Sequence, residues 1–193
     1  MAILKIALMG NPTLKKIAEP VADPRAPEIA RLAVDMRETL EDIKANGLAA
    51  PQVHVSKRVV VYRVAPHQIP PGSTMQPIPW RVLVNPVLTP LTEEKKPIWE
   101  RCLSVPGLHG EVPRYTRIHM KAQQLDGSTL EVDASGFHAM LLQHEIDHLD
   151  GILYPMRMPD LRLLGYNDEW AKSPIELADE AGESPDGSAE AAE

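Results

Sequence analysis

Apolar residues recur at helical spacing in two segments of the chain. From Ala26 to about Lys44 an apolar side chain returns every three or four residues, with Pro27 in the first turn, which predicts one long amphipathic helix. A second helix is predicted from about Ser135 to Leu149. Ser135 is a typical N-cap residue, and Gly151 follows the segment, where a left-handed residue often ends a helix.

Shorter apolar runs predict strands. The two most apolar of them, Arg58–Val64 and Trp80–Val87, are typical of buried strands. Between them residues 65–79 hold five prolines and a glycine, which predicts a surface excursion. Further strands are expected at Ile3–Leu8, Pro97–Ser104, Arg117–Leu125 and Thr129–Val132, the last two joined in a hairpin at Asp126–Ser128. The pattern predicts an α+β domain of mostly antiparallel strands around the second helix as the central one, with the long N-terminal helix packed outside.

Composition narrows the class of protein. The chain has 193 residues, 44% hydrophobic and 24% charged, as expected for one globular domain. Aromatic residues make up only 4%, which disfavours a single-stranded nucleic-acid binder. The single cysteine, Cys102, excludes an intramolecular disulfide, and the apolar runs are too short to span a membrane. Because no signal peptide is visible either, we expect a cytoplasmic protein.

The negative charge is concentrated at one end of the chain. The formal net charge is −7, but residues 168–193 hold nine acidic residues and one lysine. The remainder is therefore nearly neutral, and no basic patch for direct nucleic-acid binding is expected. We expect residues 1–170 to form one folded domain and 171–193 an acidic, disordered tail.

The strongest chemical signal is an HExxH motif, His144-Glu145-Ile146-Asp147-His148, on the central helix. Residues four apart lie on the same side of a helix, so His144 and His148 can offer two imidazole nitrogens to one metal ion. Glu145, about 100° further round, can reach a water on that metal without being a ligand. The alternative is a surface helix with two histidines beside acidic residues.

A third ligand decides which kind of site this is. One large class of metallopeptidases continues the motif to a third histidine, but the corresponding residue here is Tyr154. The remaining soft ligand is Cys102, which as a lone cysteine could instead be an inert buried side chain. A set of Cys102, His144 and His148 would leave a fourth tetrahedral position for water, as in catalytic rather than structural sites.

Three separated motifs resemble those of the peptide deformylases. They occur in the same order as in that family, and the resemblance extends over about residues 3–160. The motifs are Gly47-Leu48-Ala49-Ala50-Pro51-Gln52, Glu100-Arg101-Cys102-Leu103-Ser104 and Gln143-His144-Glu145-Ile146-Asp147-His148-Leu149-Asp150-Gly151.

The resemblance implies a metal-dependent hydrolase that removes the formyl group from N-formylmethionyl nascent peptides and releases formate. It implies that Cys102, His144 and His148 bind one divalent metal ion, Fe²⁺ in the cell, with Zn²⁺, Ni²⁺ or Co²⁺ as replacements. Glu145 would take a proton from water and pass it to the departing amine. The side-chain amide of Gln52 and the backbone N–H of Leu103 would receive the developing oxyanion.

The resemblance also implies how the peptide is bound. Gly47 and the segment of Glu100 and Arg101 would pair with an extended substrate in the manner of an added strand. The methionine side chain would enter an apolar pocket, although the helical spacing of three of its four residues equally fits ordinary core packing. The four residues are Ile98, Phe137, Met140 and Leu141.

Some positions depart from the family pattern, and other functions remain open. Ala45 and Asn46 stand where the family has glycine and an aliphatic residue, and Arg101 stands where it has glycine. We therefore expect activity with a shifted substrate preference.

The rival functions are a metallopeptidase and a non-catalytic relative that binds metal or formylated peptides. An ion pair of Arg114 with Asp147 is also expected to hold the ligand helix in place, unless both charges are simply solvated.

Overall fold

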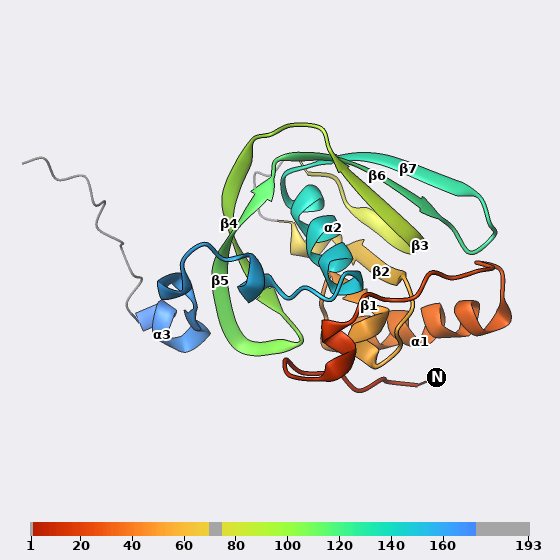
Figure 1. The fold of residues 1–193 in the computed structure, drawn as a ribbon, viewed down its shortest axis with the longest axis horizontal. Helices are drawn as coiled ribbons and strands as arrows, with labels where there is room; N and C mark the ends of the chain where they lie inside the picture. The colour runs from red at the N-terminus through yellow and green to blue at the C-terminus, as the bar shows by residue number, and fades with distance from the viewer. Residues whose placement is uncertain (1, 70–74, 173–193) are drawn as a thin grey trace, which may run out of the picture.

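A computed structural model describes residues 2–69 and 75–172 of the chain. The fold is α+β, and its strands pair in antiparallel fashion (Figure 1). Residues 173–193 of the expected acidic tail and residues 70–74 of the expected surface excursion lie outside the described residues. Within the described ranges, no helix combines the length and apolar character that a membrane crossing requires.

The strands form two sheets. The larger sheet has the order β1–β2–β3–β6–β7 and the smaller one the order β4–β5–β8, so β1 and β4 each lie at a sheet edge. The larger sheet consists of β1 (Gly47–Ala49), β2 (Val59–Val64), β3 (Ile78–Pro90), β6 (Arg117–Gln123) and β7 (Thr129–Ser135). The smaller sheet consists of β4 (Lys95–Cys102), β5 (Val105–Tyr115) and β8 (Gly165–Tyr166).

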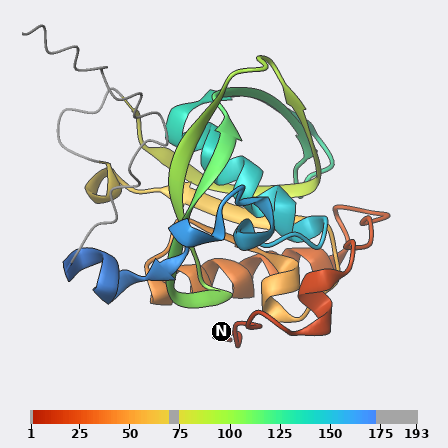
Figure 2. The same cartoon turned by 60° about the vertical axis from the view of Figure 1, so that its left-hand side comes forward.

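The principal helices, α1 (Pro27–Ile43) and α2 (Gly136–Leu149), cover opposite faces of β2 (Figures 1 and 2). Successive side chains of a strand point to opposite faces, and those of β2 are buried on both. Val60 packs in the cluster that contains the α2 residues, whereas Val61 packs in the cluster that contains the α1 residues. This double burial explains why β2 is apolar at every position except Arg63. Both helices lie within one residue of the predicted bounds.

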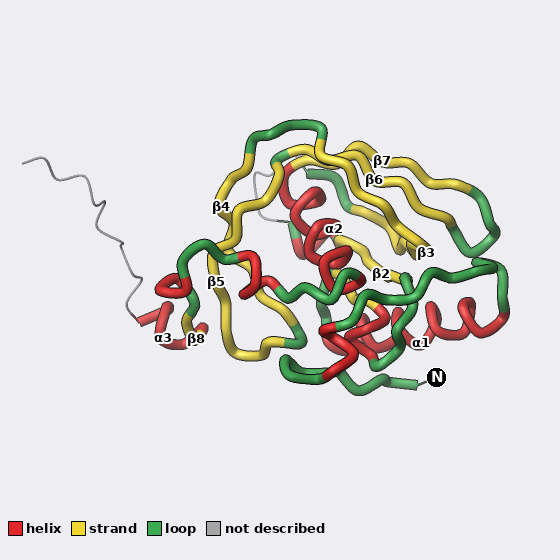
Figure 3. Tube along the Cα trace, in the orientation of Figure 1, coloured by secondary structure: helices red, strands yellow, loops and turns green. Residues whose placement is uncertain are grey.

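The remaining secondary structure is short. One more α-helix, α3 (Asn167–Lys172), follows β8, and 3₁₀ turns connect several elements (Figure 3). Two of these turns bear on the site: η2 (Ala50–Val53) follows β1, and η4 (Tyr154–Arg157) follows α2. Gly151 has φ +75° directly after the C-cap of α2, as predicted. Ser135 is the N-cap of α2, but its side chain makes no capping hydrogen bond, contrary to the expectation.

The strand predicted at Ile3–Leu8 is wrong. This segment belongs to no sheet, because two of its N–H groups are bonded to separate elements instead of to one neighbouring strand. Leu4 N–H donates to the hydroxyl of Thr39 on α1, and Ala7 N–H donates to the carbonyl of Gln52 in η2. The N-terminal segment therefore ties α1 to the turn that follows β1.

The sequence pattern did not predict β5. This strand contains two prolines and two glycines, which resemble loop residues, yet it pairs with β4 from Tyr115 opposite Lys95 to Val105 opposite Cys102. One of the glycines has a packing role, because a Cβ on Gly110 would lie 2.6 Å from the sulfur of Met158. Long-range pairing with β4 thus stabilises a strand whose local sequence does not favour one.

Candidate metal centre and substrate cleft

Helix α2 presents His144 and His148 toward the end of β4. Their ring centroids are 5.0 Å apart, and the Cys102 sulfur lies 3.3 Å from Nε2 of His148. One ligand atom from each of these three side chains lies within 4.8 Å of the other two, and all three residues are buried. The structure therefore brings the Cys102 thiol together with two imidazoles that lie 42 and 46 residues further along the chain.

The donor set fits a divalent transition metal. One sulfur and two imidazole nitrogens are typical ligands of Zn²⁺ and Fe²⁺, and three protein ligands leave a coordination position for substrate or water. Nδ1 of His144 donates to Glu100 at 2.7 Å, which directs Nε2 of the same ring away from Glu100 and toward the cluster. Tyr154, at the position of the missing third histidine, is buried with its ring stacked near that of His144 at 6.4 Å.

The protonation of the cluster is also compatible with a cation. Burial lowers the pKa of His148 well below its ordinary value, so this imidazole is neutral. Burial also acts to lower the pKa of His144, but its hydrogen bonds with Cys102 and Glu100 outweigh burial and raise the pKa. A cation that binds here would therefore displace a proton from His144.

A buried chain of charges fixes His144 from behind. Glu100, only 2% exposed, accepts from His144 through one carboxylate oxygen and from Arg114 through both. Arg114 also donates to Asp147 at 2.6 Å, and Arg157 donates to both oxygens of Asp147. The predicted ion pair of Arg114 and Asp147 is therefore confirmed, and it is buried rather than solvated. The role of Glu100 in this chain was missed, because pairing across two strands and a helix is not visible in sequence spacing.

Gln52 is held with its amide nitrogen toward the cluster. Its Oε1 accepts from Ala49 N–H at 2.8 Å, while its Nε2 donates to the Cys102 sulfur at 3.6 Å and to the Ser104 hydroxyl at 3.4 Å. The N-terminal segment supports both residues of the contact between Gln52 and Ser104, since Ala7 N–H donates to the carbonyl of Gln52 and Met9 N–H to the carbonyl of Ser104. Gln52 can therefore offer a fixed N–H donor beside the thiol.

Glu145 is buried against the backbone of β1. The residue is 3% exposed, and its Oε2 has no hydrogen-bond partner in the described part of the chain. Burial raises the pKa of Glu145 to about 7, with Glu100 acting in the same direction and His144 against it. A carboxyl group with this pKa can both accept and return a proton near neutral pH.

Gly47 leaves the space that Glu145 occupies. A Cβ at position 47 would overlap Oε1 of Glu145 and lie 2.6 Å from its carboxyl carbon. We expect Gly47→Ala to lower kcat at least about tenfold by displacing this carboxylate, since small misplacements of reacting groups have large effects. Steady-state kinetics and a thermal unfolding curve of the same sample measure the two consequences separately.

Gly110→Ala is the matched control for this variant. The added methyl group meets the sulfur of Met158 at 2.6 Å, outside the cluster, so Gly110→Ala should lower stability and leave kcat close to that of the unmodified protein. If Gly47→Ala changed stability but not kcat, the position of the Glu145 carboxylate would not matter for turnover.

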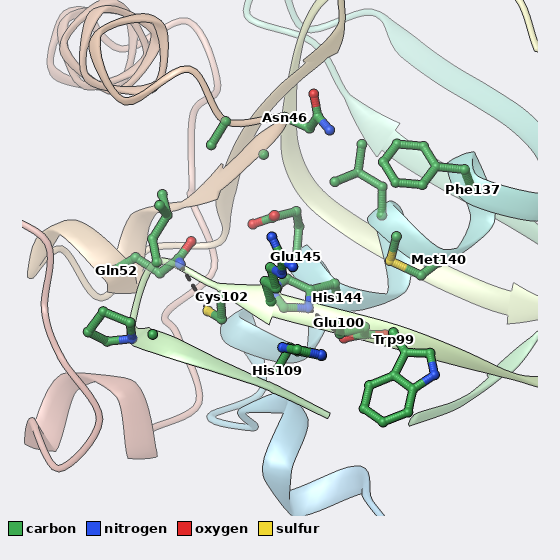
Figure 4. Close-up of a pocket in the computed structure, with 17 residues that line it drawn as sticks. Asn46, Gln52, Trp99, Glu100, Cys102, His109, Phe137, Met140, His144 and Glu145 are labelled. Atoms are coloured by element: carbon green, nitrogen blue, oxygen red, sulfur yellow. Dashed lines mark hydrogen bonds and ion pairs between the residues drawn. The ribbon is translucent and has the colours of Figure 1, made fainter. Parts of the chain in front are cut away.

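A cavity of about 700 Å³ opens beside the cluster (Figure 4). The edge strands β1 and β4 contribute to its wall, and α2 contributes the side chains of Phe137, Met140 and Leu141. Most of the predicted site residues line it, namely Gly47, Gln52, Glu100, Arg101, Cys102, Leu103, Phe137, Met140, Leu141, His144 and Glu145.

Ile98 is not among the residues that line this cavity. It is half-buried on β4 opposite Val112. Conversely, Trp99 and His109 line the cavity although nothing in their spacing pointed to it, because only the pairing of β4 with β5 brings them together. Their rings are in edge contact at 5.2 Å.

Comparison with known proteins identifies this arrangement. The family model for polypeptide deformylase matches residues 3–163. The chain belongs to the polypeptide deformylase family. It is 45% identical to peptide deformylase 1 of Nitrosomonas europaea over 166 residues, 86% of this chain and 93% of that protein. Peptide deformylase 2 of Ralstonia nicotianae is 41% identical with the same two coverages.

Solved deformylase structures share the fold. A class I type b peptide deformylase from Acinetobacter baumannii with bound Met-Ala-Ser has a TM-score of 0.73 and 35% identity, and the match covers 81% of this chain and 99% of that one. The enzyme from Thermotoga maritima has a TM-score of 0.72 at 31% identity, with coverages of 83% and 100%. The resemblance inferred from the three sequence motifs is therefore confirmed.

Proposed function

We propose that this deformylase hydrolyses the formamide bond of N-formylmethionyl peptides and releases formate and a free methionyl amino terminus. The observation that carries the proposal is the meeting of Cys102, His144 and His148 in one buried cluster beside Gln52, next to a cavity that Glu145 lines. The family match supports the reaction, and the relative with bound Met-Ala-Ser supports a methionyl peptide as the occupant of the cleft.

Cys102, His144 and His148 would hold one divalent metal ion, Fe²⁺ in the cell, which Zn²⁺, Ni²⁺ or Co²⁺ can replace. The ion supplies Lewis-acid chemistry, polarising a carbonyl group and lowering the pKa of water. Glu100 accepts a hydrogen bond from His144, so we assign its side chain to ligand positioning, while its backbone would belong to the strand that pairs with the peptide.

The protein's own residues carry the proton and the charge. Glu145 removes the proton from the attacking water and delivers it to the amine that leaves the formyl carbon. Nε2 of Gln52 and the backbone N–H of Leu103 donate to the oxyanion that forms on the former carbonyl oxygen. Because Ala49 already fixes the amide of Gln52, this donor needs little reorganisation during the reaction.

The peptide would bind as an added strand between the edges of β1 and β4. Both edges contribute to the same cavity, through Gly47 on one side and Arg101 on the other. The methionine side chain points to the apolar wall of α2 formed by Phe137, Met140 and Leu141. We propose that residues 1–170 form this catalytic unit and that it acts in the cytoplasm without binding nucleic acid directly.

Product analysis tests the proposal. The metal-loaded protein should release formate from formyl-Met-Ala-Ser in equal amount to the new amine, with no cleavage inside the peptide. A chelator should stop the reaction, and adding back each metal ion in turn should show which ions support it. Internal cleavage would indicate a metallopeptidase, and peptide binding without formate would indicate a non-catalytic relative.

A further inference from the structure

Arg101 is an unpaired cation at the substrate cleft. It is exposed, it lines the cavity, and no ion pair or hydrogen bond joins it to another side chain in the described residues. Other arginines near the site differ, since Arg114 and Arg157 both pair with Asp147. The positive charge of Arg101 therefore remains available to a ligand in the cleft.

The alternation of side chains along β4 determines which side of the cleft Arg101 faces. Glu100 is buried against α2 and its neighbours Trp99 and Arg101 are exposed, so these two point to the opposite side of the strand, which pairs regularly with β5 as far as Arg101. In the view of Figure 4, Trp99 lies below Met140 and Phe137 lies above it. A peptide added along this edge follows the same alternation. Its methionine points to the apolar wall of α2, and its next side chain points to the side of Arg101.

We propose that Arg101 makes this deformylase prefer formylmethionyl peptides with an acidic residue directly after the methionine. This inference rests on the proposed function and adds to it the chemistry of the second substrate residue. The contact would be an exposed guanidinium–carboxylate pair on the open side of the cleft, where such a pair contributes modestly to binding.

Other charges near this side of β4 do not neutralise Arg101. Glu111 lies on β5 opposite Trp99. Asp168 and Glu169 lie in the first turn of α3, which packs on β5. None of these carboxylates forms an ion pair with Arg101 in the part of the chain that the structure describes, and Glu169 pairs with Lys172 instead. The acidic groups inside the cleft are buried, on the other side of the strand.

The test compares peptides that differ only in charge. We expect kcat/KM for formyl-Met-Asp-Ser to exceed that for formyl-Met-Asn-Ser by about threefold at low ionic strength, mainly through KM. The ratio should approach one in roughly 0.5 M salt, because an exposed pair is screened. Arg101→Gln should reduce the ratio to one, and Arg101→Glu should invert it and favour formyl-Met-Lys-Ser over formyl-Met-Gln-Ser.

Lys96→Gln is the matched control. Lys96 is an exposed cation on the same strand, but it pairs with Glu94 and does not line the cavity, so its loss should leave the Asp/Asn ratio unchanged. A ratio of one in the unmodified protein would overturn the inference. A threefold ratio that persisted in Arg101→Gln would overturn it as well.

A binding measurement separates this inference from the proposed function. If no peptide yields formate, the proposed function has failed, whereas formate from every peptide at equal rates leaves the function intact and removes the role of Arg101. Titration with the unformylated peptides Met-Asp-Ser and Met-Asn-Ser tests the charge preference without any turnover. Tighter binding of Met-Asp-Ser that Arg101→Glu reverses is the expected result, and equal binding would contradict it.

Discussion

Replacing Glu145 by glutamine is expected to lower kcat by about 10³-fold while the protein keeps its metal ion. Among the described residues, two carboxyl groups line the cavity, those of Glu100 and Glu145. Arg114 binds the carboxyl group of Glu100, which leaves Glu145 as the proton carrier. Glutamine has nearly the same shape but cannot accept and return a proton. Metal analysis and single-turnover formate release on the same sample measure both parts of this prediction.

Two further variants give this experiment its contrast. Cys102→Ala should lose the metal ion together with activity, because it removes one of three proposed ligands. Glu131→Gln changes a carboxylate on β7 that pairs with Lys121, outside the cavity, and should behave like the unmodified protein. A Glu145→Gln protein with more than a tenth of the original kcat would refute the assignment of Glu145 as the proton carrier.

Arg114→Met is expected to lower the free energy of unfolding by about 3–5 kcal/mol. The Arg114 side chain is 4% exposed and is the guanidinium that joins Glu100 to Asp147. Its removal leaves the buried charge of Glu100 with His144 as its remaining partner. It also deprives Asp147 of one of its two arginine partners. Denaturant unfolding should show a lower midpoint, and thermal unfolding a Tm lower by roughly 10 °C.

Arg157→Met provides the comparison for this stability effect. The Arg157 side chain is 46% exposed, so solvent screens its pair with Asp147, and its loss should cost about 1 kcal/mol or less. Arg114→Met should also weaken metal binding about tenfold or more, because Glu100 would no longer be held against His144. Equal stability losses in the two variants would mean that burial of the Arg114 charge has no special importance.

The parts of the fold that local pattern predicts well are those with regular burial. Helix α1 buries Ile29, Ala33, Met36 and Leu40, whose spacing matches the helical repeat, and β2 is apolar on both faces because a helix covers each. By contrast, Ile3–Leu8 has a strand-like composition but no neighbouring strand, and β5 has one despite its prolines and glycines.

The candidate site shows the same division. His144 and His148 lie on one helix, so their spacing alone places them together. The three separated motifs correctly indicated that Cys102 and Gln52 approach these histidines, but the contact itself depends on the pairing of β4 with β5 and on the N-terminal segment. The contact of the Glu100 side chain with His144 could not be predicted, because sequence proximity to Cys102 does not reveal which way a strand residue points.

The sequence by itself determined the two principal helices, the buried strand β2, the HExxH pair and the family. Each of these depends on residues that are close in the chain or on motifs whose order is fixed. Only the tertiary structure decided that Glu100 accepts a hydrogen bond from His144, that Ile98 lies off the cavity, and that Trp99 and His109 line it. These features depend on strand pairing between distant segments and on which face each strand buries, and a one-residue change of register would reverse them.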